Sequence, residues 1–184
     1  KTLKKLISHQ QFQIHFQPIV MMETGKTAHH EVLMRFDGHA SPYDLIVLGE
    51  DAGIAPDIDM SVCRQTLKFI DLHMAQQDVG KLAVNLSGSS IQNETFIESL
   101  FETLAMYPQA AKHLMFELTE SSSIQKLDMV DGFIQRLRQK GHQVCLDDFG
   151  AGAASFQYLH KLHVDGVKID GAYTKSVLTS PRDA

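Results

Sequence analysis

Short hydrophobic runs alternate with longer amphipathic stretches through most of this chain, and this alternation limits its fold more than any other feature. The expected strands after residue 80 span 82–86, 114–118, 143–147 and 166–169, and the expected helices span 58–77, 93–106, 126–139 and 155–162. Strands that alternate with helices favour a parallel sheet whose neighbouring strands are joined by helical crossovers.

The first two predicted strands differ from the rest because only a short turn joins them. Alternating apolar and polar residues predict a strand at 12–17 and a second at 27–36, with a turn at 23–26. A connection this short joins antiparallel strands, so the chain is expected to open with a hairpin. A helix is then expected over 41–53, where a serine and a proline supply the usual start signals.

Polar residues follow several of these strands at the point where each strand ends. Glu31, Asn85, Glu117 and the Asp147-Asp148 pair each come after a short hydrophobic run. Active sites of parallel barrels lie at the carboxyl ends of the strands. The placement therefore favours a barrel, and an open doubly wound sheet is the competing architecture.

Composition excludes several classes of protein. With 184 residues and 43% hydrophobic content, the chain can form one domain with a substantial core. The net charge of -5 and the lack of a basic cluster argue against a nucleic-acid polymer or a membrane surface as partner. No apolar run approaches the ~20 residues of a membrane span, so a cytoplasmic location is expected. Cys63 and Cys145 are expected to be buried thiols without a disulfide scaffold.

A cluster of carboxylates at one rim requires a positive charge among them. Each close carboxylate pair would repel by about 4 kcal/mol at intermediate dielectric. Oxygen ligands from aspartate, glutamate and asparagine suit Mg²⁺ or Mn²⁺, whereas a Cys/His set typical of structural zinc is absent from this rim. His29-His30 and the pair His160 and His163 offer a rival metal site, but adjacent strand residues face opposite ways, so His29 and His30 cannot both join one site. These histidines are expected to face solvent or to be hydrogen-bonded.

Six segments, in their order and separations, resemble the EAL domain family. They are Gln17-Pro18-Ile19-Val20, Glu31-Val32-Leu33, Val84-Asn85-Leu86-Ser87, Glu117-Leu118-Thr119-Glu120, Asp147-Asp148-Phe149-Gly150 and Lys168-Ile169-Asp170. The resemblance implies an α/β fold, a TIM-like (β/α)8 barrel with an antiparallel first strand. Residues 1–184 would be an EAL domain incomplete at its C-terminus, truncated after about strand six, and the fragment alone is expected to be inactive.

The resemblance also implies a function and the residues that carry it. EAL domains are cyclic di-GMP phosphodiesterases, or degenerate receptors of the same nucleotide. The implied metal ligands are Glu31, Asn85, Glu117 and Asp147, with Asp147 and Asp148 serving a second Mg²⁺ or Mn²⁺ ion. The implied catalytic residues are Lys168, Glu31 and Asp147, the implied substrate-binding residues are Gln17, Arg35 and Asp148, and Glu120 would steady the loop after Asp148.

Two departures from the family pattern keep alternatives open. Ala151 and Ala153 stand where most active members carry threonine and tyrosine, so a cyclic di-GMP receptor without turnover is the second hypothesis. Val32 replaces the usual alanine beside Glu31, at a position expected to face away from the metal. An interaction scaffold that binds no nucleotide is the third hypothesis. The expected partners are cyclic di-GMP, a second copy in a homodimer and fused regulatory domains.

Overall fold

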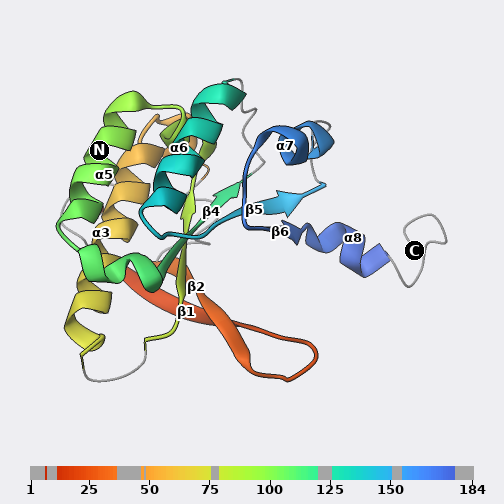
Figure 1. The fold of residues 1–184 in the computed structure, drawn as a ribbon, viewed down its shortest axis with the longest axis horizontal. Helices are drawn as coiled ribbons and strands as arrows, with labels where there is room; N and C mark the ends of the chain where they lie inside the picture. The colour runs from red at the N-terminus through yellow and green to blue at the C-terminus, as the bar shows by residue number, and fades with distance from the viewer. Residues whose placement is uncertain are drawn as a thin grey trace.

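The computed structural model of the chain describes residues 7, 12–36, 47, 49–75, 79–119, 126–150 and 155–176. This part forms one curled sheet, a half-barrel of six strands in the order β1-β2-β3-β4-β5-β6 (Figure 1). The strands are β1 Gln13–Val20, β2 Thr27–Arg35, β3 Leu82–Leu86, β4 Leu114–Thr119, β5 Val144–Phe149 and β6 Gly166–Ile169. β1 and β2 pair antiparallel and every later neighbouring pair is parallel. Strand order follows chain order without a reversal, which rejects the doubly wound alternative.

The larger helices lie together on one side of the curled sheet (Figure 1). The helices are α3 Ala55–His73, α4 Gly88–Ile91, α5 Glu94–Ala105, the 3-10 helix η1 Pro108–Lys112, α6 Leu127–Gln139, α7 Ser155–Lys161 and α8 Gly171–Ser176. On α5, Phe96, Leu100 and Leu104 are buried, so the stripe at helical spacing belongs to the core. The helices thus cover the outer face of the sheet, and the polar side chains of the candidate site lie on its inner face.

Most predicted elements are confirmed, with boundaries that differ by a few residues. The strands at 82–86 and 166–169 have the expected limits, whereas β5 continues to Phe149. The helix expected at 58–77 begins at Ala55, because a proline in the first turn costs no hydrogen bond. Two short helices, α4 and η1, were not expected. The helix expected over 41–53 falls mainly outside the described residues.

Successive strand residues point to opposite faces, and the burial of the sheet follows that rule. Val84, Leu86, Phe116 and Leu118 are wholly buried against the helices. Val32, with 3% exposure, faces the same way, as expected for a position turned away from the carboxylates. The outer face of the sheet is therefore the hydrophobic core.

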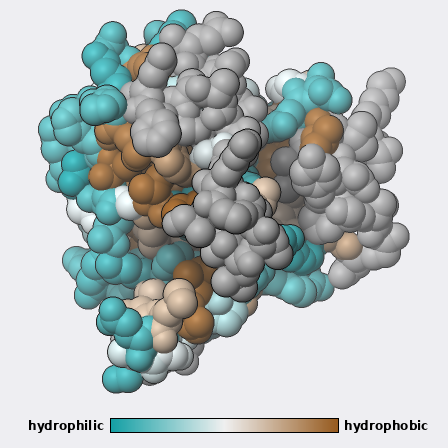
Figure 2. Space-filling model, turned by 90° about the vertical axis from the view of Figure 1, so that its right-hand side faces the viewer, coloured by the Kyte–Doolittle hydropathy of each residue, from teal (hydrophilic) through white to brown (hydrophobic). Residues whose placement is uncertain are grey.

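The far edge of the described sheet is more open than its centre. Val167 and Ile169 of β6 are 42% and 63% exposed, whereas β4 is buried along almost its whole length. Figure 2 views the molecule from this side and shows hydrophobic surface in several places among hydrophilic side chains. Both cysteines are free thiols, Cys63 buried and Cys145 half-buried. None of the described helices has the length and hydrophobicity that crossing a membrane requires.

Candidate metal centre and ligand pocket

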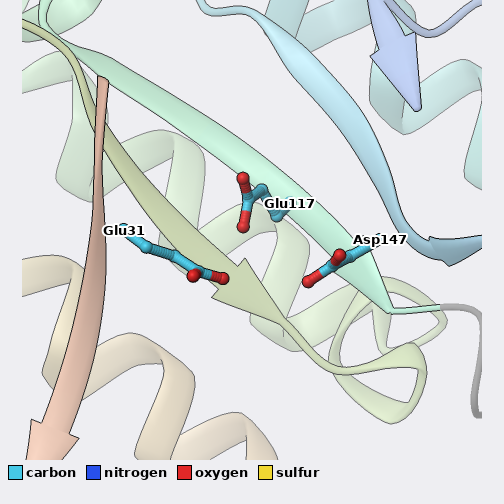
Figure 3. A group of neighbouring side chains, drawn as sticks. All are labelled: Glu31, Glu117 and Asp147. Carbon is cyan, nitrogen blue, oxygen red and sulfur yellow. The ribbon is translucent and has the colours of Figure 1, made fainter. Parts of the chain in front are cut away.

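Three carboxylates from different strands meet on the inner face of the half-barrel. Glu31 comes from β2, Glu117 from β4 and Asp147 from β5, and each offers an oxygen within 4.8 Å of the other two (Figure 3). Asn85 joins them from β3, because it pairs in register with Glu117. The residues expected at strand ends are thus brought together, although Glu31 lies in the middle of β2 and not at its end.

Lys168 extends from β6 into the middle of this cluster. Its Nζ donates hydrogen bonds to Glu31 Oε1 at 2.8 Å, Glu117 Oε2 at 2.8 Å and Asp147 Oδ2 at 3.1 Å. One ammonium group offsets only part of the charge of three carboxylates. The geometry therefore marks the centre of the cluster as a place for positive charge.

Burial and hydrogen bonds shift the pKa values of the two glutamates of the cluster in opposite directions. Burial raises the pKa of Glu117 to about 7, because its carboxylate is taken out of water. Burial is also the largest single influence on Glu31, but the hydrogen bond and charge of Lys168, together with hydrogen bonds to Glu117 and Asn85, outweigh it, so the pKa of Glu31 falls below its usual value. Burial disfavours the charge on Lys168, yet its bonds to Glu117 and Glu31 raise its pKa, so the ammonium persists.

Two buried oxygens of this cluster have no hydrogen-bond partner among the described residues. They are Asn85 Oδ1 and Glu117 Oε1. An acceptor buried without a donor costs about 1–3 kcal/mol. Asn85 Oδ1 lies beside further carboxylates, so the donor set of the cluster fits a hard cation such as Mg²⁺ or Mn²⁺. Glu117 Oε1 instead faces His29 Nε2.

Asp147 and Asp148 both reach one cavity although they are neighbours on a strand. Asp148 has a φ of 53°, in the left-handed region, and its backbone N–H donates to Asp147 Oδ1 at 2.9 Å. The pairing of β5 with β6 also shifts register between Leu146 and Phe149. Burial and the nearby charge of Asp147 raise the pKa of Asp148. This local break in the strand places both carboxylates beside the same space.

A cavity of about 570 Å³ lies next to the carboxylates. Arg35, Asn85, Asp147 and Asp148 contribute its polar wall, and side chains such as Val62 contribute its apolar wall. The volume lies within the range of small-molecule pockets. Arg35 Nη1 also donates to the carbonyl of Met34 at 2.9 Å, which holds the guanidinium at the rim of the cavity.

Four further residues named in the sequence analysis are Gln17, Glu120, Ala151 and Ala153. Gln17 is exposed on β1 and lies directly opposite Glu31 in the antiparallel pair, so it stands beside the cluster rather than in the cavity wall. Glu120, Ala151 and Ala153 lie outside the described residues. The predicted loop contact of Glu120 and the effect of the two alanines therefore stay predictions.

The expectation for the histidines is confirmed at one position and wrong at another. His163 Nδ1 pairs with Asp131 Oδ1 at 2.9 Å, on the surface. His29, however, points to the inner face, and its buried Nε2 has no hydrogen-bond partner among the described residues. The spacing of two residues from Glu31 was the available signal, because residues two apart in a strand share a face.

Asp59 is a half-buried polar residue that the sequence analysis does not single out. Its Oδ2 accepts hydrogen bonds from the backbone N–H of Ser87 at 2.8 Å and from Ser90 Oγ at 2.7 Å. These bonds tie α3 to the start of α4, two residues beyond Asn85. Burial raises the pKa of Asp59 to about 6. Its position among the apolar residues of a helix was the only sequence signal for this anchor.

Comparison with known proteins places this geometry in a family. Residues 1–184 match the EAL domain. The chain is 31% identical over 185 residues to the cyclic di-GMP phosphodiesterase PdeF of Escherichia coli K12, a match that covers 98% of this chain and 24% of PdeF. The chain thus spans about a quarter of the length of that relative.

Two solved structures share the fold. The FimX EAL domain superimposes with a TM-score of 0.85 at 24% identity, over 99% of this chain and 75% of that structure. The PaMucR phosphodiesterase in complex with c-di-GMP superimposes with a TM-score of 0.80 at 27% identity, over 98% of this chain and 75% of that structure. Because the match to the EAL domain covers residues 1–184, the chain belongs to the EAL domain family.

Proposed function

We propose that this chain is part of a metal-dependent phosphodiesterase that hydrolyses cyclic di-GMP to linear pGpG in bacterial signalling. The observation that supports this most is the meeting of Glu31, Glu117 and Asp147 around Lys168, next to a cavity of about 570 Å³. Relatives at about 30% identity are phosphodiesterases for the same nucleotide, which agrees with the proposal.

In this proposal, Glu31, Asn85, Glu117 and Asp147 hold one Mg²⁺ or Mn²⁺ ion, and Asp147 and Asp148 share a second. Such ions polarise a phosphoryl oxygen and lower the pKa of a bound water. The buried Asn85 Oδ1 supports this ligand set, since it accepts no hydrogen bond from the part of the chain that the structure describes and can bind a cation. The left-handed backbone at Asp148 supports the second role, because it keeps both aspartates at one cavity.

The residues of the chain then have separate tasks in the hydrolysis. A water oxygen forms a bond to phosphorus, the bond from phosphorus to the ribose 3′ oxygen breaks, and that oxygen takes a proton. Lys168 would stabilise the charge that develops on the phosphate oxygens. Arg35 would donate two parallel hydrogen bonds to a phosphate, and Gln17, on β1, would bind the nucleotide.

The further domains and the second copy that would join this chain are also part of the proposal. The chain covers about a quarter of the length of PdeF, so we propose that residues 1–184 form the EAL part of a longer protein with fused regulatory domains. A homodimer is proposed on the resemblance alone, and Glu120 is proposed to steady the loop after Asp148.

A receptor of cyclic di-GMP without turnover is the second candidate. Its support is the pair Ala151 and Ala153, which removes side chains able to anchor the loop after β5. Binding would use the same cavity and Arg35, whereas the ordered loop that hydrolysis needs would be lost.

Chromatographic detection of pGpG tests these candidates. The full-length protein is incubated with cyclic di-GMP in Mn²⁺ or Mg²⁺, and in parallel with a chelator. We expect product only with the metal, none from Glu31→Ala, and normal product from Val84→Ala, a wholly buried residue of the outer face. Nucleotide binding without product in either metal would favour the receptor, and calorimetry without any heat of binding would favour a scaffold.

A further inference from the structure

His29 lies beneath the carboxylate cluster on the inner face of β2. It precedes Glu31 by two residues, and its Nε2 lies 3.6 Å from Glu117 Oε1. The side chain of Glu117 is 0% exposed and that of His29 is 16% exposed. Neither Nε2 nor Oε1 has a hydrogen-bond partner among the described residues. A buried nitrogen that can donate a hydrogen bond thus faces a buried oxygen that can accept one.

The two oxygens of Glu117 face different groups. Oε2 accepts from Lys168 at 2.8 Å, in the centre of the cluster. Oε1 faces His29 across 3.6 Å, beyond the ~2.7–3.2 Å of an N–H···O bond. A shift of about half an ångström would close this gap. A carboxylate that binds a metal through one oxygen is commonly held by a hydrogen bond to the other.

We propose that His29 is a positioning residue whose Nε2–H donates to Glu117 Oε1 and so turns Oε2 toward the ion. The inference rests on the proposed metal site and deepens it. Orienting bonds of this kind are typically worth 10–100-fold in metal affinity. His29 therefore acts through Glu117 and does not touch the substrate.

A direct ligand role for His29 fits the geometry less well. The oxygens that surround Lys168 Nζ are Glu31 Oε1, Glu117 Oε2 and Asp147 Oδ2. His29 stands on the other side of the Glu117 carboxylate, next to Oε1. An ion at the Lys168 position would meet Glu117 before it met the imidazole.

Mn²⁺ affinity of the full-length protein, measured by the electron paramagnetic resonance signal of free Mn²⁺, tests the inference. We expect His29→Ala to weaken binding 10–100-fold, and His29→Gln, whose amide N–H reaches a similar place, to restore most of it. His30→Ala is the matched control, because the neighbouring residue faces the other way and should leave affinity unchanged. Circular dichroism shows whether each variant folds.

Three results would overturn the inference. Equal Mn²⁺ affinity in wild type and His29→Ala would remove the positioning role while the metal site stands. Nitrogen coupling from His29 in pulsed spectra of bound Mn²⁺ would make it a direct ligand. ¹⁵N spectra that show no proton on His29 Nε2 would exclude the hydrogen bond even if His29→Ala fails to fold. If the wild-type protein binds no Mn²⁺, the proposed metal site is wrong, and the positioning role of His29 is wrong with it.

Discussion

The two faces of the same strands differ completely in what they carry. On the inner face, Glu31 and Glu117 crowd around Lys168, and two oxygens lack hydrogen bonds among the described residues. On the outer face, the neighbours Val32 and Phe116 are buried in an apolar core. A shift of one residue along a strand exchanges one environment for the other.

This difference separates the residues that stabilise the fold from those proposed to act on the ligand. The outer face contributes hydrophobic burial, which scales with the area removed from water. The inner face keeps like charges and unpartnered acceptors together, an arrangement that costs stability until a cation binds. Substitutions on the two faces should therefore have opposite signatures in activity and in stability.

The largest expected effect is on the inner face. Lys168→Ala should lower kcat for cyclic di-GMP by roughly 10²–10³-fold, because it removes a positive charge aimed at the phosphate. The same change should leave Mn²⁺ affinity unchanged or higher, since Nζ competes for the oxygens that would hold the ion. Steady-state kinetics and Mn²⁺ titration check both parts, and retained turnover would break the assignment of Lys168.

Phe116→Ala should produce the largest loss on the outer face. Phe116 is fully buried and packs edge-on against His142 with ring centroids 5.4 Å apart. Truncation should lower the free energy of unfolding by about 3–5 kcal/mol. Urea unfolding measures this, with Phe116→Leu as a milder control. A stable variant with lost activity would show that the two faces are not separate.

Asp59 should make the free energy of unfolding depend on pH. Its pKa is about 6 in the folded state against 3.8 when unfolded, so the folded state holds the proton more tightly. This contribution is complete below pH ~4 and is lost as pH rises through about 6, on the order of 3 kcal/mol in all.

Asp59→Asn keeps an acceptor for Ser87 N–H and Ser90 Oγ but cannot ionise. Urea unfolding of both proteins between pH 4 and 7 should show that the variant loses less stability across this range than the wild type does. Parallel curves would contradict the assignment of that slope to Asp59.

Val32→Ala should have the smallest effect. It removes two methyl groups from a side chain that is 3% exposed, so the loss of stability should be about 1–2 kcal/mol. The kcat should persist because Val32 faces away from Glu31, whereas the KM for the nucleotide should rise slightly because Val32 also lines the cavity. A large loss of turnover would show that packing on the outer face alters the positions of the inner-face residues.

Much of the fold could be predicted because local patterns are strong in the central strands. The alternation of apolar runs and helical stretches located β3 and β6 at their observed limits. Antiparallel pairing of β1 and β2 followed from the short turn between them. The short helix α4 was missed, since Ser87 caps only four residues and no periodicity can form over that length.

The candidate site was predictable only as a set of residue types. Asn85, Glu117 and Asp147 follow hydrophobic runs, and parallel strands end at one rim, whereas Glu31 follows the more polar residues 27–30. The sequence does not predict the approach of His29 to Glu117 or the anchor at Asp59, because these depend on Glu117 Oε1 and Ser87 N–H, which lie far away in the chain. Sequence spacing reveals which face a residue takes but not what stands opposite it.

The sequence by itself determined the order of strands and helices, the apolar outer face and the carboxylates at the strand ends, because these follow from local periodicity. Only the tertiary structure decided that Lys168 Nζ reaches three carboxylates at once and that Asp148 adopts a left-handed backbone to join Asp147. Such contacts depend on the curl and register of the sheet, which are fixed by packing between segments distant in sequence.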